Sequence, residues 1–294
     1  MGRTATFLGL IRFEHTLFAL PYAVAGAFLA AEGWPPAWTF LWILVAMVGA
    51  RTAAMTFNRL VDRRFDATNP RTAGRASVTG AVSPGYMVVA TLISVALFFL
   101  AAWMLRVEGK APWAFWLAGP TLLVLLGYSL TKRFFSGAHY VLGIALGLSP
   151  LGAWVAVQGS PAGAWPALWL GAAVLFWTAG FDILYAFQDV EHDRREGLHS
   201  VPARMGRTGA LLLARLSHAL VPIALYLTGR SAGLGWIYQT AVVLVAALLV
   251  VEHALLRGGR FDRIAQAFFH VNVVIAFVVM LGTILDLLIH GGAP

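Results

Sequence analysis

Long apolar runs recur along the whole chain, and they constrain its fold more than any other feature. Spanning the hydrocarbon of a bilayer as an α-helix takes about 20 predominantly apolar residues. Nine runs of this kind can be followed, at approximately 15–31, 37–57, 84–105, 112–130, 139–157, 164–185, 209–228, 235–256 and 267–288. With 60% hydrophobic and 12% charged residues, the chain lies outside the range of ordinary soluble domains. We therefore predict an all-α polytopic membrane protein of nine transmembrane helices.

The unbroken runs also exclude other architectures. A transmembrane β-barrel would show alternating segments of about 10 residues, which this chain lacks. Little sequence lies outside the runs, so we expect a single domain, residues 1–294, folded as one bundle. The first run starts after Glu14 and His15 without an evident cleavage site, and we expect it to remain as the first span. The absence of cysteine excludes disulfides and thiolate metal sites.

The distribution of basic residues predicts an orientation. The net charge is +8, which in a soluble protein would suggest a nucleic-acid partner. Here, however, the charge is divided between the two sides of the predicted bundle. One side carries only Arg106, Lys110 and Arg230. Two further arginines, Arg51 and Arg215, lie inside or at the edge of spans. All the other lysines and arginines lie on the opposite side. The positive-inside rule places that richer side, and the N-terminus with it, in the cytoplasm. We expect no nucleic-acid partner.

Two acidic stretches break the apolar pattern near the predicted cytoplasmic ends of the second and sixth spans. They read NRLVDRRFD at 58–66 and DILYAFQDVEHD at 182–193. Residues at i and i+4 share one face of a helix, so each stretch predicts a polar stripe about 12 Å long at about 1.5 Å per residue. The second span and the sixth have the same orientation, so both stripes should lie at the same membrane face. The similarity also suggests a parallel internal repeat.

These stripes favour a divalent cation. A single Asp at a span end is usually a solvated cap or the partner of a nearby arginine. Matched triplets are different, because like charges at i and i+4 repel and each ion at membrane depth costs at least about 2.5–3.5 kcal/mol. Carboxylate and amide oxygens favour Mg²⁺, which substrate phosphates commonly complete. The arginine-bearing loops at 69–75 and 194–207 suit phosphate contacts, so we predict a site for a diphosphate with an apolar tail.

The whole pattern resembles the UbiA superfamily of intramembrane prenyltransferases. The resemblance covers essentially the whole chain and rests on nine helices and on two motifs, NxxxDxxxD and DxxYxxxDxxxD, in the second and sixth spans. Within the superfamily, FEHTLFALP, NPRTAGR and LYAFQDVEHDRREGLHSVPAR are similar to 4-hydroxybenzoate polyprenyltransferase-like enzymes of bacterial quinone synthesis, including those of the futalosine route to menaquinone. The NPRTAGR loop departs from that of ubiquinone-pathway members, which leaves the acceptor open.

The resemblance implies roles for individual residues. It implies Mg²⁺ held by Asn58, Asp62, Asp66, Asp189 and Asp193, with the four aspartates serving catalysis through the metal. It implies that diphosphate oxygens are bound by Arg12, Arg51 and Lys132. Two tyrosines, Tyr128 and Tyr185, are expected to face the allylic cation, because π-faces attract cations. Asp182 is a candidate base or acceptor-orienting group.

The expected reaction joins two substrates at the membrane. The polyprenyl diphosphate loses its diphosphate, and an aromatic acid such as 4-hydroxybenzoate or a dihydroxynaphthoate receives the prenyl group. We expect an integral protein of the bacterial cytoplasmic membrane, embedded in the lipid bilayer, with its site facing the cytoplasm and the loops 67–83 and 194–208 as lids. The sequence points to no particular oligomeric state. The alternatives are a prenyltransferase with another acceptor, such as haem or glycerol phosphate, an ion-coupled transporter, and a non-catalytic scaffold.

Other polar residues receive simpler interpretations. We expect His139 at the membrane interface and His192 solvated on the outer face of the sixth helix or its exit. Glu252 and Asp286 lie in or near the last two spans, and the sequence assigns them no role.

Overall fold

The computed structural model describes residues 9–10, 18–255 and 264–290, with the side chains of 264–268 and 290 left aside. Over this part of the chain every regular element is helical and no strand occurs, which confirms the all-α prediction. The long helices are α2 (Leu20–Ala31), α3 (Ala37–Val61), α6 (Pro84–Val107), α7 (Pro112–Thr131), α8 (Ala138–Gln158), α9 (Trp165–Tyr185), α11 (Val201–Ser231), α12 (Trp236–Leu255) and α13 (Ile264–His290). Each overlaps one predicted span, although α11 begins eight residues before the span predicted at 209–228.

The helices have the length and surface of membrane spans. Among the described residues, eight helices are long and apolar enough to cross a bilayer, and α2 adds a shorter apolar helix of 12 residues. Large apolar side chains stand exposed on their outer faces, with Leu123 77% and Val243 68% accessible. Such exposure is unfavourable in water and is expected against lipid. The chain is an integral membrane protein.

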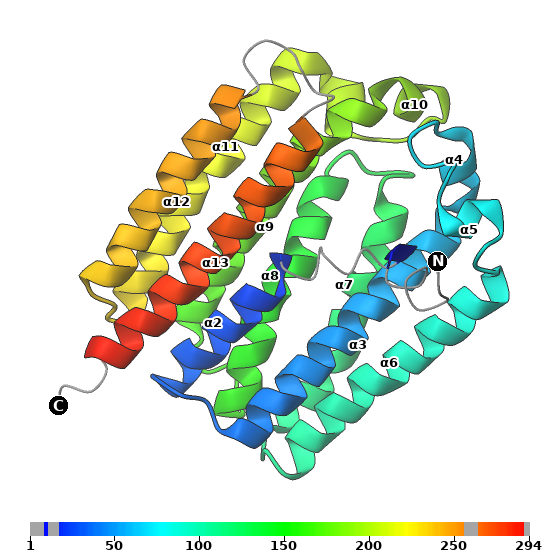
Figure 1. Ribbon diagram of the computed structural model, residues 1–294. Helices are drawn as coiled ribbons and strands as arrows, with labels where there is room; N and C mark the ends of the chain where they lie inside the picture. Colours follow the sequence, from blue (N-terminus) through cyan, green and yellow to red (C-terminus); the bar gives the residue numbers. More distant parts are fainter. Residues whose placement is uncertain (1–8, 11–17, 256–263, 291–294) are drawn as a thin grey trace.

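Four short helices gather at one end of the bundle (Figure 1). These are α4 (Arg63–Thr68), α5 (Ala76–Thr79), the 3₁₀ helix η2 (Ala186–Asp189) and α10 (Val190–Arg195). Both acidic motifs run through this end, since α3 continues into α4 and α9 into η2 and α10. The two motifs therefore open toward the same face of the bundle.

The predicted straight helical stripes were wrong in one respect. Helix α3 ends at Val61, Asp62 adopts φ −91° and ψ 1°, and α4 then begins. The second motif passes through a 3₁₀ turn at the corresponding place. The backbone N–H of Asp66 still donates to the Asp62 carbonyl at 2.8 Å, so the turn continues while its direction changes. A straight helix would stack the like-charged carboxylates in one line, where they repel, whereas the bend turns them toward different basic partners.

A seam of small residues brings α8 against α9. A Cβ atom on Gly147 would lie 2.6 Å from the carbonyl oxygen of Gly171, and one on Gly143 would lie 2.5 Å from that of Leu175. Only glycine permits such close backbone approach, which is typical of packed membrane helices. This contact fixes the start of α8 beside the end of α9, where the second acidic motif begins.

The two acidic residues without a predicted role lie in the C-terminal part of the bundle. Asp286 on α13 accepts hydrogen bonds from the backbone N–H groups of Gly235 and Tyr238, at 2.7 and 2.9 Å. Gly235 directly precedes α12 and Tyr238 lies in its first turn, where N–H groups have no intrahelical partner. Glu252 is fully buried and accepts a hydrogen bond from Asn272 at 3.0 Å. Both acids therefore satisfy polar groups between the last helices.

Candidate active site

A cavity of about 270 Å³ lies where the two motifs meet. Its walls include the polar residues of the first motif, Asn58, Asp62 and Asp66, and those of the second, Asp182, Asp189 and Asp193. More than 100 residues of chain separate the motifs, yet they share this one space. The structure thus brings together the acidic residues that the sequence predicted to act jointly.

Asp62 is held from both sides. Its Oδ2 accepts a hydrogen bond from Asn58 Nδ2 at 2.8 Å, and its Oδ1 lies 3.4 Å from Arg133 Nη2. Arg59 in turn donates to Asn58 Oδ1 at 3.2 Å. Burial, followed by the neighbouring Asp66 carboxylate, raises the pKa of Asp62 above its ordinary value. Asn58 therefore orients this carboxylate, which additional positive charge would stabilise.

Asp66 keeps one carboxylate oxygen unused. Its Oδ1 accepts from Arg75 Nη1 at 2.6 Å, while its backbone carbonyl accepts from Thr72 Oγ1 at 3.0 Å. Its Oδ2 is buried and has no hydrogen-bond partner among the described residues. A buried acceptor without a partner is unfavourable, so this oxygen is suited to receive a ligand.

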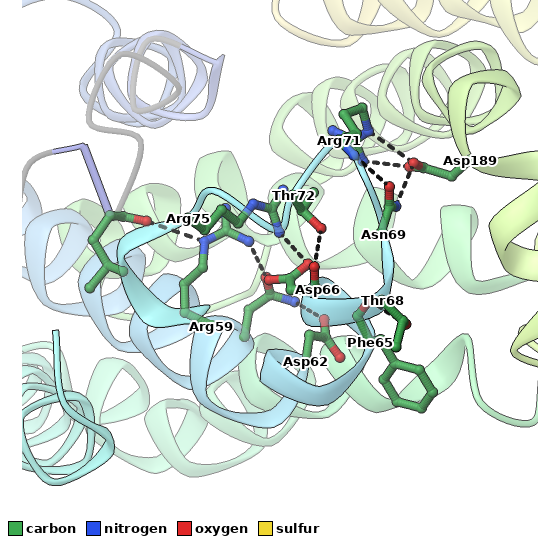
Figure 2. Close-up of polar contacts among 12 residues, drawn as sticks. Arg59, Asp62, Phe65, Asp66, Thr68, Asn69, Arg71, Thr72, Arg75 and Asp189 are labelled. Carbon is green, nitrogen blue, oxygen red and sulfur yellow. Dashed lines mark hydrogen bonds and ion pairs between the residues drawn. The ribbon is translucent and has the colours of Figure 1, made fainter. Parts of the chain in front are cut away.

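Asp189 is bound by the loop that follows the first motif (Figure 2). Asn69 Nδ2 donates to its Oδ1 at 2.8 Å. Arg71 binds the same carboxylate in bidentate fashion, with Nε 2.9 Å from Oδ1 and Nη2 donating to Oδ2. Bidentate pairing of this kind is strong and geometrically specific. The loop therefore crosses from one half of the site to the other.

Asp193 faces a single cation at longer range. Lys132 Nζ lies 3.8 Å from its Oδ2, an atom that is buried and lacks a hydrogen bond in the described part of the chain. The backbone carbonyl of Asp193 accepts from the N–H of Leu198, and the carbonyl of Lys132 accepts from the N–H of His199, at 2.8 and 2.7 Å. The end of α7 and the segment after α10 are thus fixed beside each other.

The counter-charges come from loop arginines and a lysine. The repulsion within the triplets suggested a metal ion as the necessary partner, but four basic side chains already fill this role. Within the described residues, no three His, Asp or Glu side chains are close enough together to hold a metal ion. The donor set nevertheless fits a hard cation, because it is made of oxygen, and Asp66 and Asp193 each keep a buried oxygen without a hydrogen bond.

A second cavity, of about 400 Å³, adjoins the first and is almost wholly apolar. It lies among α3, α6, α7 and α8, next to the start of α2 at Ala19, and is lined mostly by alanine, leucine and valine. Tyr128 and Leu142 line both cavities, so the charged space and the apolar space meet at these two residues. The arrangement can receive a molecule with an anionic head and a long hydrocarbon tail.

The remaining predicted residues are distributed differently. Lys132 and Tyr128 line the charged cavity, whereas Arg51 lines the apolar one. Tyr185 lines neither cavity and packs against the apolar cluster that contains Ile183. Arg12 lies outside the described residues.

Two histidines contradict the sequence expectation. His139 is fully buried between α8 and α9 instead of lying at the interface, because both of its ring nitrogens have hydrogen-bond partners inside the protein. His192 is also buried and lines the charged cavity, since the 3₁₀ turn before α10 changes the face that the helix presents inward.

Several other residues in or beside the cavity could not be identified individually from the sequence. These are Arg59, Asn69, Arg71, Arg75, Arg133 and His192, which line the cavity, and His139, which binds the cavity residue Asp182. The basic loops were recognised as phosphate contacts, but no periodicity indicates which loop residue reaches which carboxylate. Arg59 directly follows Asn58, and neighbouring residues of an ideal helix point in different directions.

Comparison with known proteins identifies the class. The model of the UbiA prenyltransferase family matches residues 19–274, most of the chain. The chain belongs to this family, and it is a prenyltransferase. Two curated relatives are 4-hydroxybenzoate octaprenyltransferases. That of Aeromonas hydrophila is 32% identical over 268 residues, covering 90% of this chain and 89% of the relative. That of Pectobacterium atrosepticum is 29% identical over 290 residues, covering 97% and 98%.

Solved structures show the same fold. The apo structure of a UbiA homologue from Aeropyrum pernix K1 has a TM-score of 0.83 and 32% identity, covering 93% of this chain and 98% of that one. A UbiA homologue from Archaeoglobus fulgidus, solved with GPP and Mg²⁺, has a TM-score of 0.69 and 20% identity over 95% and 99% of the two chains. At that identity the second likeness shows the fold alone.

Proposed function

We propose that this prenyltransferase transfers a polyprenyl group from polyprenyl diphosphate to an aromatic acid, in a reaction that depends on Mg²⁺. One observation carries the proposal: a cavity lined by both acidic motifs opens onto an apolar cavity through Tyr128 and Leu142. The charged space suits a metal and a diphosphate, and the apolar space suits an isoprenoid chain.

Mg²⁺ would be held by oxygen atoms from both motifs, Asp62 and Asp66 on one side and Asp189 and Asp193 on the other. When bound, it neutralises the charge that develops on the diphosphate as the allylic C–O bond breaks. Asn58 acts by holding the Asp62 carboxylate in place. The buried oxygens of Asp66 and Asp193 that lack a hydrogen bond among the described residues support this assignment.

The basic residues of the cavity complete the diphosphate site. Lys132, Arg133, Arg71 and Arg75 line the cavity and lie within ion-pair distance of its carboxylates. When the diphosphate enters, these cations gain a second anion, to which guanidinium groups bind in bidentate fashion. Tyr128 stands between the head and tail spaces, where an aromatic face stabilises an allylic cation. The apolar walls keep out water, which would otherwise capture that cation.

The acceptor is proposed from chemistry and from the relatives. Both curated relatives reported above are named for 4-hydroxybenzoate, and the sequence also resembles enzymes of menaquinone synthesis. We infer 4-hydroxybenzoate or a dihydroxynaphthoate-like acid, with haem or glycerol phosphate as the alternative acceptor class. The transporter alternative is not retained, because the chain belongs to a prenyltransferase family and its acidic motifs gather at one end of the bundle.

We further propose that the site faces the cytoplasm of a bacterial cell and that residues 1–294 form a single domain. The excess of arginine around the motif-bearing end supports this orientation. Because these 294 residues include no cysteine, one introduced thiol reports sidedness directly. In sealed spheroplasts, a membrane-impermeant maleimide should label Trp34→Cys, in the connection at the opposite end of α3, but should leave Glu191→Cys, beside the second motif, unlabelled. The reverse pattern would refute the orientation.

The activity is tested by incubating the purified protein in lipid with a polyprenyl diphosphate and a panel of acceptors, followed by mass analysis of the products. The panel contains 4-hydroxybenzoate, a dihydroxynaphthoate, haem and glycerol phosphate. We expect a prenylated aromatic acid in the presence of Mg²⁺ and none after chelation with EDTA. A product formed only from haem or glycerol phosphate would contradict the proposed acceptor, and turnover undiminished by EDTA would contradict the proposed metal.

A further inference from the structure

His139 connects three elements around the charged cavity. It lies in the first turn of α8 and is fully buried. Its Nδ1 is 2.6 Å from Oδ2 of Asp182, near the end of α9, and its Nε2 accepts a hydrogen bond from the backbone N–H of Val201 at 3.3 Å. Val201 is the first residue of α11, where the leading N–H groups have no intrahelical acceptor. One side chain thus holds a carboxylate and caps a helix.

These two contacts determine which ring nitrogen carries the proton. A backbone N–H can only donate, so Nε2 must be the acceptor and must carry no hydrogen. A neutral imidazole then carries its hydrogen on Nδ1, which donates to Asp182. The pair is therefore a neutral histidine donating to a carboxylate. Its Nε2 is already occupied, so the imidazole is not available to take a proton from a substrate.

Asp182 consequently presents one oxygen to the cavity. Its side chain is 30% exposed and forms part of the cavity wall, together with Lys132 and Asp189. Oδ2 is bound by His139, while Oδ1 accepts no hydrogen bond from any described residue. A carboxylate oxygen in this state is a strong acceptor for a hydroxyl group.

The helices that carry this pair are closely packed. His139, Gly143 and Gly147 occupy positions i, i+4 and i+8 on one face of α8, the face that packs against α9. The glycine seam keeps this face in close contact with α9 up to the level of Asp182. Neither partner can move away without separating the two helices.

From this geometry, and on the basis of the proposed function, we propose that His139 is a positioning residue for the acceptor. It holds Oδ2 of Asp182 so that Oδ1 receives the hydroxyl of the aromatic acid, which places the ring beside the allylic end of the prenyl chain. Asp182 is thus assigned to the acceptor and is not one of the carboxylates proposed to hold the metal, although it lines the same cavity. The wall formed by Asp182 selects acceptors that carry a hydroxyl group.

Two substitutions separate this role from that of a helix cap. In His139→Asn, the side-chain amide nitrogen takes the place of Nδ1 and keeps the donor to Asp182, but the contact with Val201 is lost. In His139→Gln, the side-chain amide oxygen reaches the place of Nε2 and accepts from the N–H of Val201, but the donor to Asp182 is lost. Tyr140→Phe is the control, because it removes a hydrogen bond between α8 and Ser217 of α11 without touching Asp182.

The measurements are kcat and the KM of each substrate with the full chain in lipid. We expect His139→Gln to raise the KM for the aromatic acid roughly tenfold or more, since hydrogen bonds to charged groups contribute about 1.5–3 kcal/mol. The KM for the prenyl diphosphate should stay within about threefold of wild type. We expect His139→Asn and Tyr140→Phe to retain the wild-type acceptor KM.

Each other outcome overturns a definite statement. If His139→Gln keeps the wild-type acceptor KM while His139→Asn does not, the residue is a helix cap and the proposal is wrong. If both variants raise the KM values of the two substrates equally, the role is general packing and the proposal is equally wrong. A wild-type protein that prenylates no aromatic acid would instead refute the proposed function, a result visible before any variant is compared.

Discussion

Asn69 donates a hydrogen bond to Asp189 at 2.8 Å, although 120 positions separate the two residues in the chain. The bond ties the loop after the first motif to the carboxylate of the second motif. Arg71 reinforces it with two contacts to the same carboxylate, and Arg75 from the same loop binds Asp66. This loop, residues 69–75, is therefore the element that joins the two halves of the site, as Figure 2 shows.

The first prediction concerns this connection. Arg71→Ala removes the bidentate contact to Asp189. This should release the loop, because only one neutral hydrogen bond, from Asn69, then holds it to that carboxylate. We expect amide hydrogen exchange over residues 67–76 to become at least tenfold faster, while the long helices stay protected. Arg64→Ala is the matched control, since Arg64 is exposed on α4 and forms no described ion pair. Equal amide exchange rates in the two variants would show that the Arg71–Asp189 contact does not hold the loop.

The second prediction concerns the acidic motifs. Asp62→Asn and Asp189→Asn each replace a charged oxygen of the proposed metal site with a neutral amide of the same shape. We expect turnover to fall by about 10²-fold or more in each variant, as for other losses of charge stabilisation in a transition state. The helical circular dichroism spectrum should be unchanged.

Glu191→Gln provides the control for this series. Glu191 lies between Asp189 and Asp193 in sequence, but its side chain is exposed and does not line the cavity. Turnover in this variant should stay close to wild type. If Asp62→Asn and Asp189→Asn retain full turnover, the proposed metal assignment is wrong.

The third prediction concerns the apolar cavity. Ala46 lines it from α3, and Ala46→Phe would place an aromatic ring in the space proposed for the prenyl chain. We expect the KM for a long polyprenyl diphosphate to rise roughly tenfold, with a smaller change for a short one. Val48→Phe adds a ring two residues along, on the exposed face of the same helix, and should change neither value. If Ala46→Phe keeps the wild-type KM for both the long and the short diphosphate, the prenyl chain does not bind in this cavity.

The fourth prediction concerns stability away from the site. Glu252 accepts from Asn272, whose own oxygen accepts from Trp177 Nε1 at 2.6 Å, and all three side chains are buried. Glu252→Gln keeps an acceptor for the Asn272 amide, whereas Glu252→Leu removes this hydrogen bond. We expect Glu252→Leu to cost about 1–3 kcal/mol of stability.

Thermal unfolding in detergent measures this difference. The midpoint for Glu252→Leu should fall below those of the wild type and Glu252→Gln, and turnover below the unfolding range should be unchanged in all three. A Leu variant as stable as the Gln variant would show that the hydrogen bond contributes nothing net.

Much of the fold was predictable because the length of an apolar run can be read directly from neighbouring residues in the sequence. The span predicted at 112–130 is found as α7 from Pro112 to Thr131, and that predicted at 139–157 as α8 from Ala138 to Gln158. The breaks after Val61 and Tyr185 were not predicted, because both motifs keep helical spacing through the bend. His139 was placed at the interface for a related reason, since its two partners lie on other elements.

The amino-acid sequence by itself determined the number and position of the apolar helices and the membrane face that both acidic motifs share. It did so because helix periodicity and hydrophobic length depend only on neighbouring residues. The tertiary structure alone decided that Arg71 binds Asp189, that Arg75 binds Asp66 and that His139 binds Asp182. Such pairs depend on where loops and helix ends meet in space, and the short-range pattern of a chain carries no information about that distance.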